Sequence, residues 1–140
     1  MNDLISLLET QKEQLDSLAV MLESELHLIS TRDAEALTKV LQEKTELLDK
    51  ISLTDQTLKT TFESHKDPMS NADVEQLFEQ INQSLAQCKF RTEINQKAVE
   101  QGQLRLEHLR TLLLESRAKE TMTYDKSGKP KGGTAGKGIS

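Results

Sequence analysis

Tryptophan is absent from this sequence of 140 residues, there is one cysteine, and aromatic residues make up only 3%. A single cysteine excludes an internal disulfide and a cysteine-based zinc site, and it favours a reducing compartment. No apolar run is longer than a few residues, so no segment is expected to cross a membrane. The first residues lack the basic region and long apolar core of a signal peptide. We therefore expect a cytoplasmic protein without membrane insertion.

What the sequence does contain is helix-forming material. Charged residues make up 29%, there are only two prolines, and Glu, Gln, Lys and Leu dominate. This composition is typical of long helices or a coiled coil, and the length suits a single domain. The sequence thus predicts an all-α fold, an antiparallel coiled-coil bundle of three long helices followed by a flexible C-terminal tail.

The net charge of −5 is unevenly distributed along the chain. Residues 121–140 hold four Lys and one Asp, so they contribute +3 and leave −8 on residues 1–120. An acidic body argues against nucleic acid as a partner, because such binding depends on neutralising phosphates. The tail also holds five of the six glycines, which is more typical of a flexible, solvated end than of a docking segment.

Heptad spacing of apolar residues predicts helices over about residues 2–29, 34–65 and 71–120. The short connections between them make successive helices antiparallel neighbours. We call the row of apolar heptad positions along each helix its seam. The seam of the first helix consists of Leu4, Leu8, Leu15, Leu18, Leu22, Leu26 and Ile29. The seam of the second helix consists of Leu37, Leu41, Leu48, Ile51, Leu58 and Phe62.

The third seam alternates steps of four and three residues: Val74, Phe78, Ile81, Leu85, Cys88, Thr92, Asn95, Val99, Gly102, Leu106, Leu109 and Leu113. On this pattern Cys88 should behave as a small buried hydrophobe. Thr92 and Asn95 would place polar groups in successive core layers. One interpretation is a register-setting polar layer with a tight helix crossing at Gly102, and the other is a hinge near Gly102.

The three predicted helices differ in length. At about 1.5 Å per residue they would measure roughly 42, 48 and 72 Å, so a straight third helix outruns its neighbours from about Arg105 onward. That surplus carries five leucines whose burial would be worth about 1.5–3 kcal/mol each. Either the chain folds back near Gly102, or these residues form a partner-binding site: Leu106, Leu109, Leu112, Leu113 and Leu114.

No pattern in the sequence indicates catalysis, a metal site or a cofactor. His27, His65 and His108 stand on separate elements without metal-ligand spacing. The glycines of residues 132–138 fail the spacing of a phosphate-binding loop. We therefore predict that the protein is not an enzyme. Phe90 and Ile94 face outward and form a small apolar patch that could extend a partner surface.

Three stretches carry a family resemblance: Glu43–Ile51 (EKTELLDKI), Ile94–Gln96 (INQ), and the ending Tyr124–Gly128 (YDKSG) with its Gly/Lys tail closing on Gly138–Ser140. They resemble the FlgN family of flagellar type III export chaperones. The resemblance implies a non-enzymatic chaperone for the two hook–filament junction (hook-associated) proteins, which it binds through the C-terminal part of the third helix. It also implies that Tyr124 contacts the cytoplasmic platform of the export gate.

A different class of function fits the same leucines. A structural adaptor could use them to form a homodimeric coiled coil, without any chaperone role. The oligomeric state in the absence of a partner separates the two hypotheses.

Overall fold

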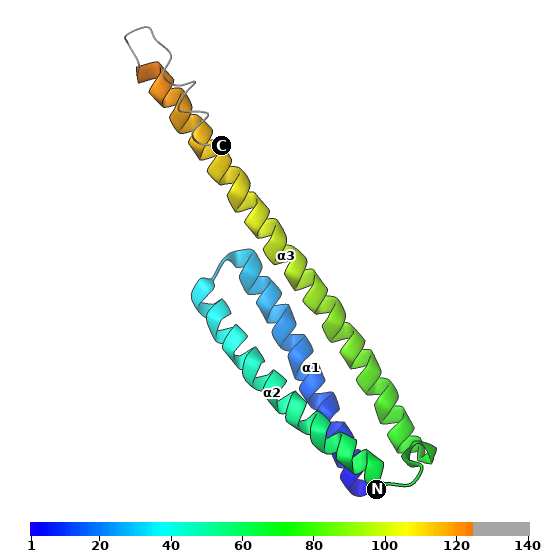
Figure 1. Cartoon of the computed structure of the whole chain (residues 1–140). Helices are drawn as coiled ribbons and strands as arrows, with labels where there is room; N and C mark the ends of the chain where they lie inside the picture. The colour runs from blue at the N-terminus through cyan, green and yellow to red at the C-terminus, as the bar shows by residue number, and fades with distance from the viewer. Residues whose placement is uncertain (125–140) are drawn as a thin grey trace. The chain divides into compact units, whose positions relative to one another are not determined.

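The computed structural model describes the backbone of residues 1–124 and the side chains of residues 1–119 (Figure 1). It contains α1 (Asn2–Thr31), α2 (Ala34–Ser64), the short 3₁₀ turn η1 (Pro68–Ser70) and α3 (Ala72–Tyr124). The predicted all-α fold of three packed helices is confirmed. α3 continues past the predicted end at residue 120, and most of the predicted tail lies outside the described residues.

The chain divides into two compact units, and the boundary falls inside α3. The first unit is Met1–Ala98 and the second begins at Val99. The first unit contains α1, α2, η1 and the beginning of α3, and its interhelical contacts define the bundle. Within residues 1–124, no helix combines the length and the apolar character needed to cross a bilayer.

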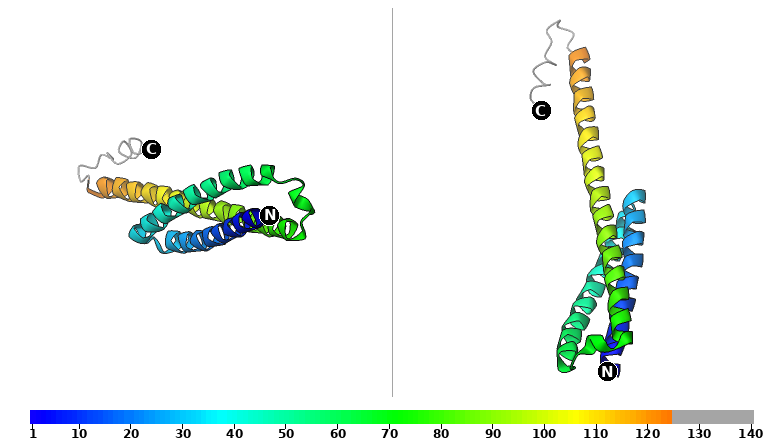
Figure 2. Two further views of the ribbon diagram at one scale, coloured as in Figure 1. Left: turned by 90° about the horizontal axis from the view of Figure 1, so that it is seen from below. Right: turned by 90° about the vertical axis from the view of Figure 1, so that its right-hand side faces the viewer.

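α1 is the central helix of the first unit. It runs antiparallel to α2 and in the same direction as the neighbouring part of α3, as the views of Figures 1 and 2 show. Eight of its residues are buried, mostly at heptad spacing, whereas α2 buries only Leu58. The buried residues of α1 are Leu4, Leu8, Gln11, Leu15, Leu18, Ala19, Leu22 and Glu25.

Two apolar clusters form the core between these helices. The first joins leucines of α1 to Leu58 of α2 and to Val74 and Ile81 of α3. Phe62 and Phe78 close it with an edge-to-face contact, their ring centroids 5.5 Å apart. The second cluster consists of Leu18, Ala19, Leu22 and Cys88, with Leu47 and Ile51 of α2 packed against it.

The helix boundaries follow from local capping chemistry. The side chain of Asp33 accepts a hydrogen bond from the Ala36 amide at the start of α2. Asn71 Oδ1 accepts from the amides of Asp73 (2.9 Å) and Val74 (3.3 Å) at the start of α3. Arg32 ends α1 in the left-handed conformation, with φ 58°.

Parts of the predicted seams are wrong in detail. Thr92 is exposed, and its hydroxyl donates to the Cys88 carbonyl within α3, so it forms no core layer. Leu41, Leu48 and Leu85 are also exposed despite their seam positions. For Leu41 and Leu48 the physical reason is that α1 supplies most of the core, so α2 buries little of its own heptad surface.

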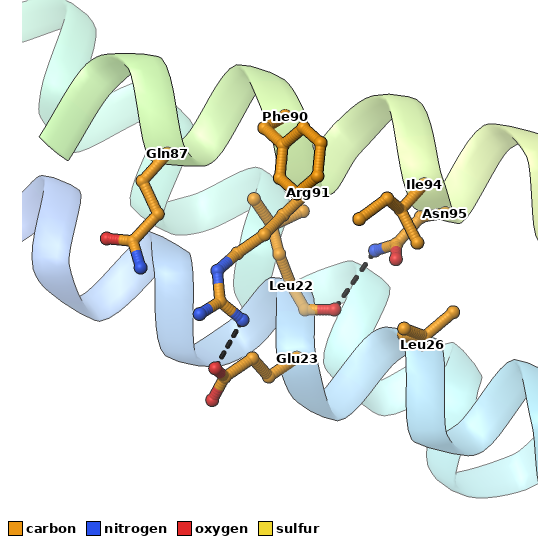
Figure 3. A pocket seen from close by; sticks show the side chains of 8 residues that line it. All are labelled: Leu22, Glu23, Leu26, Gln87, Phe90, Arg91, Ile94 and Asn95. Carbon is orange, nitrogen blue, oxygen red and sulfur yellow. Dashed lines mark hydrogen bonds and ion pairs between the residues drawn. The ribbon is translucent and has the colours of Figure 1, made fainter. Parts of the chain in front are cut away.

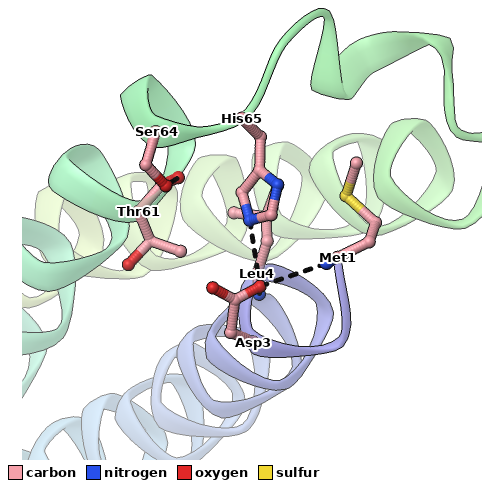
Figure 4. A network of polar contacts seen from close by, with 6 residues as sticks. All are labelled: Met1, Asp3, Leu4, Thr61, Ser64 and His65. Carbon is pink, nitrogen blue, oxygen red and sulfur yellow. Dashed lines mark hydrogen bonds and ion pairs between the residues drawn. The ribbon is translucent and has the colours of Figure 1, made fainter.

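The first turn of α1 is tied to the end of α2 by a polar network (Figure 4). Asp3 Oδ1 accepts a 2.8 Å hydrogen bond from the Leu4 amide and lies 3.0 Å from His65 Nε2 and 3.4 Å from the N-terminal nitrogen. The Leu4 amide, with smaller contributions from His65 and the N-terminal amine, lowers the pKa of the Asp3 carboxyl.

A second carboxylate connects α1 to α3. Asp16 Oδ2 lies 2.9 Å from Lys12 Nζ, and its Oδ1 accepts a 2.8 Å hydrogen bond from Ser84 Oγ on α3. The hydrogen bond from Lys12, supported by the one from Ser84, lowers the pKa of the Asp16 carboxyl. Its ionised form is therefore favoured by folding.

We expect Asp16 to stabilise the fold at neutral pH and not in acid. A carboxyl whose pKa is lowered on folding contributes stability above its unfolded value, near 4, and loses that contribution as the pH falls through the folded value. Asp16→Asn should therefore be less stable than the wild type at pH 7, and the difference should shrink as the pH is lowered below about 4, measured by urea unfolding. Asp49→Asn, which removes an exposed carboxylate on α2, is the control and should match the wild type throughout this pH range.

Candidate functional site

Four of the five leucines predicted to bind a partner are exposed in the second unit. Leu106, Leu109, Leu112 and Leu113 retain between 48% and 59% of their accessible surface, and Leu114 is half-buried. At about 3.6 residues per turn the four exposed leucines share one side of α3, whereas Leu104 and Leu114 lie outside it. We call Leu106, Leu109, Leu112 and Leu113 the leucine stripe.

The other two predicted site residues flank this stripe. Gly102 lies within the continuous helix α3, and a Cβ added there would meet no atom within 4 Å. The described residues therefore do not require glycine for a close crossing, and the hinge stays a prediction. Tyr124 is the last residue of α3, and its side chain lies outside the described residues.

Residues of the first unit show how α3 holds a neighbouring helix. Asn95 is 4% exposed, and its Nδ2 donates a 3.0 Å hydrogen bond to the Leu22 carbonyl of α1. One heptad earlier, Cys88 Sγ lies 3.3 Å from the Leu15 carbonyl. Both pairs are 73 residues apart, so the two helices run parallel in one register. Of the two predicted polar core positions, Asn95 is buried and Thr92 is not, and a register-setting role stays a prediction.

Two ion pairs between helices accompany these contacts. Arg91 of α3 pairs with Glu23 of α1. Lys44 of α2 contacts Glu25 of α1 at 2.8 Å, and this carboxylate is largely buried. Lys44 thereby neutralises a carboxylate that would be costly to bury alone.

An apolar groove lies between α1 and α3, beside the Glu23–Arg91 pair (Figure 3). Its apolar walls are Leu22 and Leu26 from α1 and Phe90 and Ile94 from α3, and its cavity volume is about 340 Å³. Phe90 remains 62% exposed. The sequence indicated the Phe90–Ile94 patch but not its α1 wall, because the pairing of distant residues leaves no local signal.

Cys88 belongs to the apolar core of the first unit. Burial raises the pKa of the Cys88 thiol, which keeps it protonated and weakly nucleophilic. Over the side chains of residues 1–119, no three His, Cys, Asp or Glu residues are grouped so that they could hold a metal ion.

Comparison with known families settles the class of protein. The family model described as FlgN protein matches residues 1–132. The chain belongs to the FlgN family. It is therefore a flagellar export chaperone and not an enzyme, and family membership implies that it binds hook-associated proteins. Neither the curated proteins nor the solved structures contain a match to it.

For this FlgN-family chaperone we expect Asn95→Ala to destabilise the bundle by about 1–3 kcal/mol, because it removes a buried hydrogen bond and leaves a small cavity. The measurement is the free energy of unfolding in urea, followed by circular dichroism. Asn82→Ala is the matched control, since Asn82 is exposed on the same helix and should change the free energy by about 0.5 kcal/mol or less. Equal effects of the two variants would contradict a specific role for Asn95.

Proposed function

We propose that this chaperone binds hook–filament junction proteins by packing their amphipathic terminal helix against the leucine stripe of α3. The observation that carries the proposal is the exposure of Leu106, Leu109, Leu112 and Leu113 on one side of a helix. Helix-on-helix packing of this kind is a recurring mode of peptide recognition.

The energetics favour a partner on this surface. Burying a leucine side chain fully is worth about 1.5–3 kcal/mol. A partner that covers these four half-exposed leucines would therefore gain several kcal/mol of binding free energy from their burial. A contiguous apolar surface of this kind usually marks an interaction site in a monomeric protein. The charged side chains within residues 99–119 keep this segment hydrated until a partner helix covers the leucine stripe.

Within the first unit, α1 already packs on α3 as the partner helix would in this proposal. α1 and α3 pair there at an offset of 73 residues, through Cys88 and Asn95 of α3. In this proposal the partner helix takes over the role of α1 at the leucine stripe.

Covering the partner's terminal helix has a functional consequence. The helix that would otherwise drive assembly of the junction protein is sequestered, which prevents premature assembly in the cytoplasm. The family resemblance further supports delivery of the complex to the cytoplasmic platform of the export gate, with Tyr124 as the docking contact. A Tyr close to the basic tail suits this role, because Tyr is enriched among residues that dominate interfaces.

The leucine stripe is tested by Leu109→Asp combined with Leu113→Asp. We expect affinity for a purified hook-associated protein of the same bacterium to fall at least about 100-fold, since each change buries a charge at the centre of the interface. Isothermal titration calorimetry measures the affinity, and far-UV circular dichroism checks that helicity is kept.

The matched control is Leu104→Asp combined with Thr111→Asp. It adds the same two charges to exposed positions on the other side of the same helical segment. Wild-type affinity in the control together with loss in the stripe variant supports the site, whereas unchanged affinity in both rejects it. A stable dimer of the free wild type, detected by light scattering, would favour the homodimeric adaptor instead.

The docking contact is tested separately with Tyr124→Ala. We expect this variant to bind the junction protein with unchanged affinity but to lose about 10-fold or more in affinity for the purified cytoplasmic platform of the export gate. Tyr124→Phe separates the ring from its hydroxyl group. Unchanged platform binding by Tyr124→Ala would remove Tyr124 from the proposal without affecting the leucine stripe.

A further inference from the structure

We infer that Arg105 selects partner helices that carry a carboxylate beside their apolar seam. The inference rests on the proposed function, because it assumes that a helix packs on the leucine stripe. Beyond the proposed function, the inference specifies one charge of the partner helix, a carboxylate next to its apolar face.

The first unit contains a template for the contact. α1 packs on α3 through Leu22, whose carbonyl accepts the hydrogen bond from Asn95, and the next residue, Glu23, pairs with Arg91 (Figure 3). Apolar burial and an ion pair thus come from consecutive residues of one amphipathic helix. A helix that packs on α3 in this way presents a carboxylate at the edge of its apolar face.

Arg105 repeats the position of Arg91 in the second unit. It follows Arg91 by fourteen residues, which is two heptads, so the two arginines occupy the same heptad position of α3. Leu109, four residues after Arg105, lies next to it on the helix surface. Arg105 is exposed, and no other residue among those described forms an ion pair with it.

α3 itself supplies no carboxylate to Arg105. Its neighbours three and four residues away are Gln101, Gly102, His108 and Leu109, and none of them is acidic. The nearby glutamates Glu93, Glu100 and Glu107 are spaced by seven residues and fall on the other side of the helix. Since no carboxylate of the described residues pairs with Arg105, we assign its partner carboxylate to the helix that packs on the leucine stripe.

The guanidinium group suits this task. It is always charged and can form two parallel hydrogen bonds to a carboxylate, which gives directional recognition as well as attraction. At the edge of an apolar interface such a pair fixes register and discriminates between partners more than it adds affinity. Arg105 would thus reject helices with a basic residue at this position, while the leucines provide the binding energy.

The test is the affinity of Arg105→Gln for a purified hook-associated protein of the same bacterium, measured at about 50 mM and about 500 mM NaCl. We expect Kd to rise roughly 3- to 10-fold at low salt and the difference from the wild type to shrink at high salt, because an exposed ion pair is screened. Thr111→Glu changes the net charge by the same amount on the other side of the helix, and it should leave Kd within about 2-fold of the wild type.

Charge reversal makes the test specific. Arg105→Glu should bind more weakly than Arg105→Gln, and one Glu→Arg or Asp→Arg change in the partner's terminal helix should restore affinity to this variant only. Equal Kd values for wild type, Arg105→Gln and Arg105→Glu would overturn the inference, as would equal weakening by Thr111→Glu. If the leucine-stripe variant loses binding while the Arg105 variants keep it, the proposed function stands and only the role of Arg105 is rejected.

Discussion

The parallel packing of α1 against α3 is the interaction on which the rest of the first unit depends. It is fixed at two points one heptad apart, where Cys88 and Asn95 of α3 reach the backbone carbonyls of Leu15 and Leu22. Without this acceptor the buried Asn95 amide would be unpaired, which is costly in an apolar environment. The observed register thus combines two contacts to backbone carbonyls with the packing of the leucines around them.

This arrangement explains why the other helices differ so much in burial. α1 contacts both neighbours and buries eight residues, while α2 covers one side of it and buries only Leu58. The buried Glu25–Lys44 pair and the half-buried Leu47 and Ile51 attach α2 to α1. α3 contacts α1 through Cys88 and Asn95 of the first unit, and the leucine stripe of the second unit is exposed.

Much of the fold could be predicted because helices are encoded locally. Heptad periodicity located all three, and the position of Cys88 predicted its burial. Thr92, Leu41 and Leu48 were assigned to the core wrongly, because a heptad pattern tells which side of a helix is apolar but not how much of that side a neighbour covers. The same limit applies to the groove beside Phe90, since its α1 wall comes from residues about 70 positions away.

The sequence by itself determined the class of structure, the approximate helix boundaries, the family resemblance and the surplus of leucines in the last helix, because composition, periodicity and capping act over a few residues. Only the tertiary structure decided that α1 is central, that Asn95 and not Thr92 is buried against it, and that Glu23 and Glu25 each pair with a different neighbouring helix. These outcomes depend on which helix faces meet and at what offset. That choice is made by the summed packing of residues far apart in the chain, which no local pattern records.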